Sequence, residues 1–143
     1  MSGVRVIYGL IATYALGSPT VVEQRAIRSG ELPIDTVLPA ISVTQVSSVP
    51  RLTLAMTEAN RMHTDRVQVS VFVKSQIGNP QGGDYPTLVT LMAFILAACP
   101  NQHGTVNGVT VDSILPDIEG PDLRAPDSSI MQRSRDFIVR WKE

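Results

Sequence analysis

The sequence predicts an α+β fold, in which an antiparallel sheet of about four to five strands carries two helices packed on one face. Residues 66–75 alternate strictly between valine and other side chains, which is typical of a strand with one buried face. Residues 2–16 and 85–99 are rich in apolar side chains at helical spacing. The expected order of helix, strands, helix and strands mixes the two element types, as α+β domains do.

The first helix should cover residues 2–16, because apolar side chains recur there every three or four positions. Gly17, with a proline two residues later, ends this helix. Gly9 inside the helix indicates close packing against a neighbouring element. After the helix we expect a short strand within residues 19–27 and an exposed turn over residues 28–35.

Residues 37–46 predict the next strand, since Ile41 and Val43 share one face. Residues 47–65 combine helix formers with threonines and a proline, so we expect either two extended arms or a loop with a loose helical turn that protrudes from the domain. A connection this long in a compact domain tends to be functional or disordered. The strand of residues 66–75 follows, and its polar second face indicates a sheet covered on one side only.

Residues 85–99 predict a helix that is apolar almost all round, so we expect it to be buried on more than one side. A two-residue Asn-Gly turn then precedes a strand over residues 109–115. Residues 116–127 contain three prolines and one glycine and are expected to be irregular. Residues 129–141 form the last predicted strand, with most of its apolar side chains on one face.

Length and composition favour one domain over residues 1–143 that has a partner. Charged residues make up 17% of the chain, below the roughly 25% of soluble domains, as on a surface that a partner covers in part. The net charge of −1 gives no general attraction to nucleic acid or to a membrane surface. No signal peptide is evident, and the apolar run at residues 88–99 is too short to cross a bilayer. We therefore expect a cytoplasm-like compartment and no membrane contact.

The reactive side chains form no recognisable catalytic or metal-binding set. Cys99 is the only cysteine and is expected to pack as a small apolar residue. A zinc site needs several Cys or His ligands close together, whereas His63 and His103 are far apart. The glycine-rich segment before the second helix lacks the lysine of a phosphate loop. We predict no enzyme, no cofactor and no metal; a small enzyme that uses Asp112 and Asp117 is the weaker alternative.

Charge is distributed unevenly in the last third of the chain. Five acidic residues fall within residues 112–127, and three arginines and a lysine follow within residues 133–142. The simpler interpretation is a charged loop followed by the solvated face of a strand. The alternative is a pair of patches of opposite sign that meet between neighbouring subunits.

Four segments resemble one protein family in their order and spacing. They read I-R-S-G-E-L-P at residues 27–33, L-P-A-I-S-V at residues 38–43, V-S-S at residues 46–48 and R-V-Q-V-S-V-F at residues 66–72. With a helix before them and a loop of variable length between the strands, they are similar to the tail completion, or tail terminator, proteins of long-tailed bacteriophages. The resemblance covers residues 4–98, and beyond these only a closing pair of strands is shared.

The resemblance implies a structural virion protein that forms a ring, usually a hexamer, at the end of the tail tube. Such a ring stops tube polymerisation and joins the tail to the head, while DNA passes through its lumen without specific binding. The implied partners are further copies of the chain, the tail tube protein and the head-tail connector or stopper protein. The site of action would be the tail or neck of a virion assembled in the host cytoplasm. The alternative is another neck component, such as a head-completion or stopper protein, because a fold does not fix a function.

Ring closure requires a heterologous interface, in which two different surfaces of one subunit meet. The expected contact surfaces are the segment of residues 47–65, the polar face of residues 66–75 and the charged C-terminal strand. The candidate subunit or partner contacts are Arg51, Glu58, Arg61, Arg66, Gln68, Lys74, Arg133 and Arg135.

Overall fold

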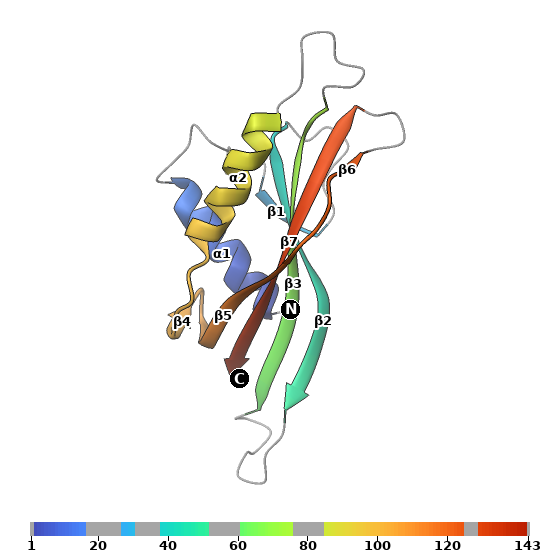
Figure 1. Cartoon of the computed structure of the whole chain (residues 1–143). Helices are drawn as coiled ribbons and strands as arrows, with labels where there is room; N and C mark the ends of the chain where they lie inside the picture. The colour runs from blue at the N-terminus through green and yellow to red at the C-terminus, as the bar shows by residue number, and fades with distance from the viewer. Residues whose placement is uncertain are drawn as a thin grey trace.

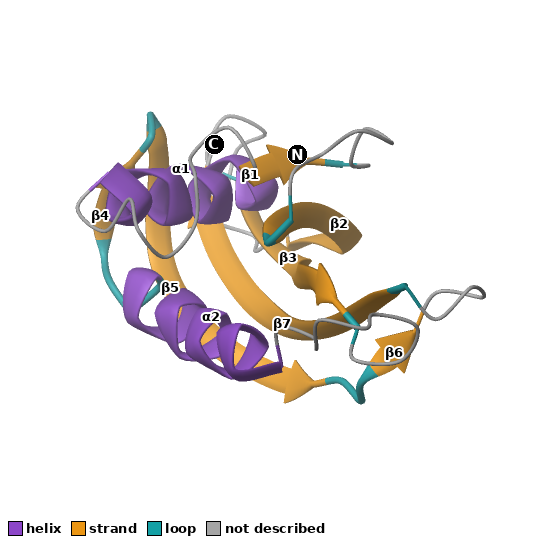
Figure 2. Ribbon diagram, turned by 90° about the horizontal axis from the view of Figure 1, so that it is seen from above, coloured by secondary structure: helices purple, strands orange, loops and turns teal. Residues whose placement is uncertain are grey.

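A computed structural model of the chain describes residues 2–16, 27–30, 38–51, 61–75, 85–124 and 129–142. In chain order the elements are α1 (Ser2–Leu16), β1 (Ile27–Ser29), β2 (Ala40–Arg51), β3 (Met62–Lys74), α2 (Tyr85–Ala98), β4 (Gly104–Val106), β5 (Val109–Glu119), β6 (Leu123–Arg124) and β7 (Ile130–Lys142). The strands form one curled sheet, and both helices lie on the same side of it (Figure 1, Figure 2). The α+β class is confirmed.

The sheet has seven strands, so the expected number of four to five was wrong. Their order is β1-β2-β3-β7-β5-β4, and β6 pairs with β7 beyond the end of β5. The pairing of β1 with β2 is parallel, and the other described pairs are antiparallel. The additional strands β1, β4 and β6 have only three, three and two residues. Segments this short show no alternation of their own and exist because a long neighbouring strand pairs with them.

Two of these short strands correct particular predictions. β1 lies where an exposed turn was expected over residues 28–35, and Ile27 at its start is fully buried. β5 continues to Glu119, and β6 follows, inside residues 116–127, which were expected to be irregular. Pairing with β7 keeps this proline-containing segment extended. The strand expected within residues 19–27 lies outside the described residues, apart from Ile27.

Strand β3 lies at the centre of the sheet, between β2 and β7. Its side chains Val67, Val69, Val71 and Val73 are fully buried, and Phe137 of β7 stands opposite Val67. Burial of an aliphatic side chain of this size contributes roughly 1.5–3 kcal/mol. The valine face predicted from the alternation is therefore the centre of the hydrophobic core.

Helix α1 packs on the sheet through Val4, Ile7 and Ile11, which are all buried. A methyl group on Gly9 of this helix would lie 2.9 Å from Nδ2 of Asn107, in the turn between β4 and β5. The close packing predicted at Gly9 is confirmed. The predicted Asn-Gly turn is also present, with positive φ angles of 48° and 80° at its two residues.

Helix α2 packs differently from the prediction. Leu88, Leu91 and Ile95 are fully buried, but Val89 and Leu96 on the other side keep 47% and 39% of their surface exposed. The helix was expected to be buried on more than one side, and in the single chain one apolar face is open. Neither described helix is long and apolar enough to cross a membrane.

Strands β2 and β3 form a long antiparallel hairpin that enters the predicted arm of residues 47–65 from both ends. The described parts of this segment are extended, while residues 52–60 lie outside the described residues. A register shift leaves Val46 of β2 as a bulge residue. This end of the hairpin points away from helix α2 (Figure 1).

Candidate interaction surfaces

The reactive groups do not converge on a chemical site in the part of the chain that the structure describes. No group of three or more His, Cys, Asp or Glu side chains is placed there to hold a metal ion. Burial raises the pKa of Cys99 to about 12, so the thiol stays protonated and unreactive at neutral pH. Its predicted role as a small buried residue is confirmed. The two aspartates of the alternative enzyme site have different partners. Asp112 lies 3.7 Å from His103, whereas Asp117 pairs with Arg66.

One ion-pair cluster lies on the helix-free face of the sheet. Arg66 of β3 contacts Asp117 of β5 at 2.5 Å and Asp136 of β7 at 3.0 Å. The hydrogen bonds to Asp136 and then to Asp117 raise the pKa of the Arg66 guanidinium. The cluster therefore ties three strands together through their side chains.

A second cluster lies on the helix-bearing face, where β5 and β6 meet β7. Arg133 Nε donates to Asp122 Oδ1 at 2.7 Å, and Arg133 Nη2 donates to the Tyr85 hydroxyl at 2.9 Å. Arg135 Nη2 donates to Glu119 Oε2 at 2.9 Å. The hydrogen bond from Arg133 lowers the pKa of Asp122. This cluster joins the start of α2 and the connection between β5 and β6 to β7.

The two clusters change the interpretation of the charged C-terminal segments. Arg133 and Arg135 stand opposite Val71 and Val69 in the register of β7 with β3, so they share the face of the core. Their side chains are only 17% and 16% exposed. Arg133 and Arg135 meet Glu119 and Asp122 inside one subunit, an arrangement that neither interpretation of the sequence anticipated.

The other predicted contact residues are spread over different parts of the molecule. Gln68 and Lys74 lie on the helix-free face of β3, with Gln68 half-buried and Lys74 exposed. Arg61, just before β3, is half-buried. Outside what the structure describes lie Glu58 and the side chain of Arg51. The described candidates occupy both faces of the sheet and do not form one surface.

A buried carboxylate that the sequence analysis missed organises the opposite end of the sheet. Asp65 is fully buried and accepts hydrogen bonds from the Gly3 amide at 2.9 Å, Trp141 Nε1 at 2.8 Å and the Ser48 hydroxyl at 2.5 Å. Gly3 lies in the first turn of α1, where amides lack partners within the helix and the dipole favours a negative charge. The sequence did carry a signal, because Asp65 extends the alternating valine face of β3 by one step.

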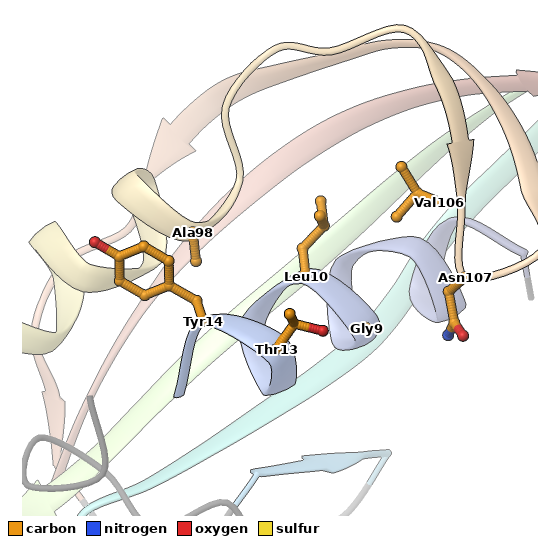
Figure 3. A pocket seen from close by; sticks show the side chains of 7 residues that line it. All are labelled: Gly9, Leu10, Thr13, Tyr14, Ala98, Val106 and Asn107. Carbon is orange, nitrogen blue, oxygen red and sulfur yellow. The ribbon is translucent and has the colours of Figure 1, made fainter. Parts of the chain in front are cut away.

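A pocket of about 580 Å³ opens between the two helices and the β4–β5 turn (Figure 3). Its lining residues are Gly9, Leu10, Thr13, Tyr14, Ala98, Val106 and Asn107. The Tyr14 ring packs edge-on against Phe94, with 5.0 Å between the ring centres. Apart from the Tyr14 hydroxyl the lining has no ionisable group, so the pocket suits apolar contact better than acid–base chemistry.

Comparison with known proteins finds likeness at the level of structure. No family model matches the chain, and no curated protein sequence matches it. The fold has a counterpart in a virion. A chain described as "Virion of native gene transfer agent (GTA) particle" has a TM-score of 0.67 to this chain, at 12% sequence identity. The match covers 96% of this chain and 92% of that chain, so the two share a fold along nearly their whole length.

Proposed function

We propose that the chain is a structural virion protein that forms a ring on the end of a phage-type tail tube. The ring stops tube polymerisation and joins the tail to the head connector. The observation that carries the proposal is the fold shared over 96% of the chain with a chain of the gene transfer agent virion. The ordered motifs at residues 27–33, 38–43 and 66–72 favour the same role on independent grounds.

The described surface supports a role in assembly. Arg66, Arg133 and Arg135 are engaged in ion pairs within the chain, and the single thiol is buried. Apolar side chains on α2 and on the β2–β3 hairpin remain open to solvent. Depletion of charge at an exposed apolar surface is typical of the centre of a protein interface.

The proposal is tested by the mass of the purified protein and by its effect on tail tubes. Six copies of 15.5 kDa give a closed ring of roughly 93 kDa in light scattering. Added to polymerising tube protein of the same virion, the ring should bind tube ends and shorten the tubes seen by electron microscopy. A chain that stays monomeric at high concentration and never binds tube ends contradicts the proposal. Binding to the connector with no effect on tube length indicates the alternative neck role.

A further inference from the structure

Helix α2 presents an uncharged apolar face that nothing in the described chain covers. We name the exposed residues Val89, Ala93, Leu96 and Ala97 the α2 outer face. They follow one another at helical spacing, so they form one stripe. The whole helix Tyr85–Ala98 contains no charged residue. An exposed stripe of this composition is typical of a surface that a protein partner covers.

A second uncharged surface lies on the β2–β3 hairpin. Residues 44–50 of β2, which we name the β2 hairpin surface, read T-Q-V-S-S-V-P. Val46 and Val49 within it keep 53% and 54% of their surface exposed. Strand β1 pairs with β2 only as far as Val43, so no described strand flanks the outer side of residues 44–50. Helix α2 and this end of the hairpin lie on different sides of the molecule (Figure 1, Figure 2).

Backbone pairing between copies is disfavoured along the open parts of β2 and β5. The open part of β2 contains a bulge at Val46 and a proline at Pro50. The open part of β5 contains Pro116 and a register shift directly after it. Bulges and prolines are the features with which proteins prevent edge strands from pairing. We therefore expect a contact between copies at residues 44–50 to be made by side chains.

We infer that the β2 hairpin surface of one copy packs on the α2 outer face of the next copy. The inference rests on the proposed ring function. The two surfaces are different and lie on different sides, so the contact is heterologous and closes a ring when a fixed rotation repeats it. Neither surface carries a charged side chain, so the contact buries no unpaired charge. Arg66 of β3 and both Arg133 and Arg135 of β7 already have acidic partners inside each subunit.

The test introduces one buried charge into each surface separately. Val89→Glu should abolish assembly through the α2 outer face, and Val49→Glu should abolish it through the β2 hairpin surface. Each variant should sediment as a 15.5 kDa monomer under conditions in which the wild type forms the ring. Both side chains are exposed in the single chain, so circular dichroism should show an unchanged fold. Ile118→Glu, at an exposed apolar residue of β5, is the matched control and should leave the ring intact.

A mixture of the two variants distinguishes this contact from a symmetric one. Val49→Glu keeps its α2 outer face and Val89→Glu keeps its hairpin surface, so the pair should form one junction and stop at a dimer of about 31 kDa. In a Cys99→Ala background, Val49→Cys with Val89→Cys in one chain should give a covalent ladder with a short bis-maleimide. Either single cysteine variant should give no ladder.

Different results overturn the inference and the proposed function. A ring that persists in both Glu variants, or that Ile118→Glu disrupts equally, contradicts the inference and leaves the ring proposal standing. The inference is also contradicted, and the ring proposal left standing, if the wild type forms a ring but the two Glu variants do not associate when mixed and the double cysteine variant gives no ladder. A wild-type chain that never assembles, alone or on tube ends, contradicts both.

Discussion

Two polar clusters lie toward opposite ends of β7, which pairs with β3, and they differ in their surroundings. At one end of the pair, Asp65 is fully buried and accepts hydrogen bonds from three neutral donors. Toward the other end, Arg133 pairs with Asp122 and Glu119 near solvent. The first cluster holds the start of α1 to the sheet, and the second holds the connection between β5 and β6.

The difference shows that the location of a polar cluster determines its contribution to stability. A buried group that loses its partner is left without a hydrogen bond in a medium of low dielectric constant. A charge at the surface that loses its partner is solvated by water, so exposed ion pairs contribute little. We therefore expect the Asp65 cluster to dominate stability and the Arg133 cluster mainly to position a connection.

The largest expected effect is that of Asp65→Ala, which leaves the buried Gly3 amide and the buried Trp141 indole without an acceptor. We expect the free energy of unfolding to fall by about 3 kcal/mol, measured by urea denaturation with Trp141 fluorescence. Asp65→Asn retains one acceptor oxygen and should lose about half as much. Equal losses in the two variants would mean that the negative charge, and not the number of accepted hydrogen bonds, provides the stability.

Gly3→Ala should have the next largest effect. A methyl group here would lie 2.7 Å from both Cβ and Oδ2 of Asp65, so we expect a loss of about 2 kcal/mol in urea denaturation. The sign is informative, because Gly to Ala normally stabilises a helix. Gly9→Ala is the control, since its methyl group meets only the side chain of Asn107 in an exposed turn. A stabilised Gly3→Ala would show that α1 does not press against Asp65.

Arg133→Ala should cost only about 0.5–1 kcal/mol, as is usual for ion pairs in contact with solvent. The loss should shrink in about 1 M NaCl, where the Debye length is roughly 3 Å, while the loss in Asp65→Ala should not change. The measurement is the midpoint of urea denaturation for both variants at low and high salt. If Arg133→Ala lost more stability than Asp65→Ala, and by the same amount at low and high salt, the Arg133 cluster would be the one that dominates stability.

The smallest expected effect is that of Asp122→Asn on stability at acidic pH. The folded pKa of Asp122 lies below its ordinary value of 3.8 because Arg133 donates a hydrogen bond to it. A lowered folded pKa contributes stability above pH 3.8 that is lost as pH falls through the folded value. Asp122→Asn should therefore lose slightly less stability than the wild type below pH 3.8, measured by thermal unfolding across pH 2–5. Parallel curves for the two proteins would show that this pair has no role in acid stability.

The elements with a strong local pattern could be predicted from the sequence. The alternation of valines predicted the central strand and its core face. Gly17 and the proline after it predicted that the first helix ends at Leu16, where α1 does end. The three short strands could not be predicted, because their conformation depends on neighbours and not on their own residues. β5 likewise continues through Pro116, where the sequence indicated an end, because β7 pairs with it there.

The interaction surfaces were less predictable for a related reason. Arg66 and Arg133 were chosen as partner contacts because they lie on the polar face of residues 66–75 and in the charged C-terminal strand. Their acidic partners lie on other strands, which only the folded sheet brings together. The apolar composition of α2 was visible, but which of its faces stays open depends on the packing of Leu88 and Ile95 against the core.

The Asp65 cluster also has a consequence for the order of folding. It connects residues 3, 65 and 141, which are separated by 62 and 76 positions along the chain. Contacts between such distant positions form slowly, because long loops must close first. A growing chain that ends before β7 lacks the Trp141 indole, so Asp65 can accept hydrogen bonds only from Gly3 and Ser48 until β7 has been synthesised. We therefore expect the complete set of hydrogen bonds to Asp65 to form only after β7 has paired with β3.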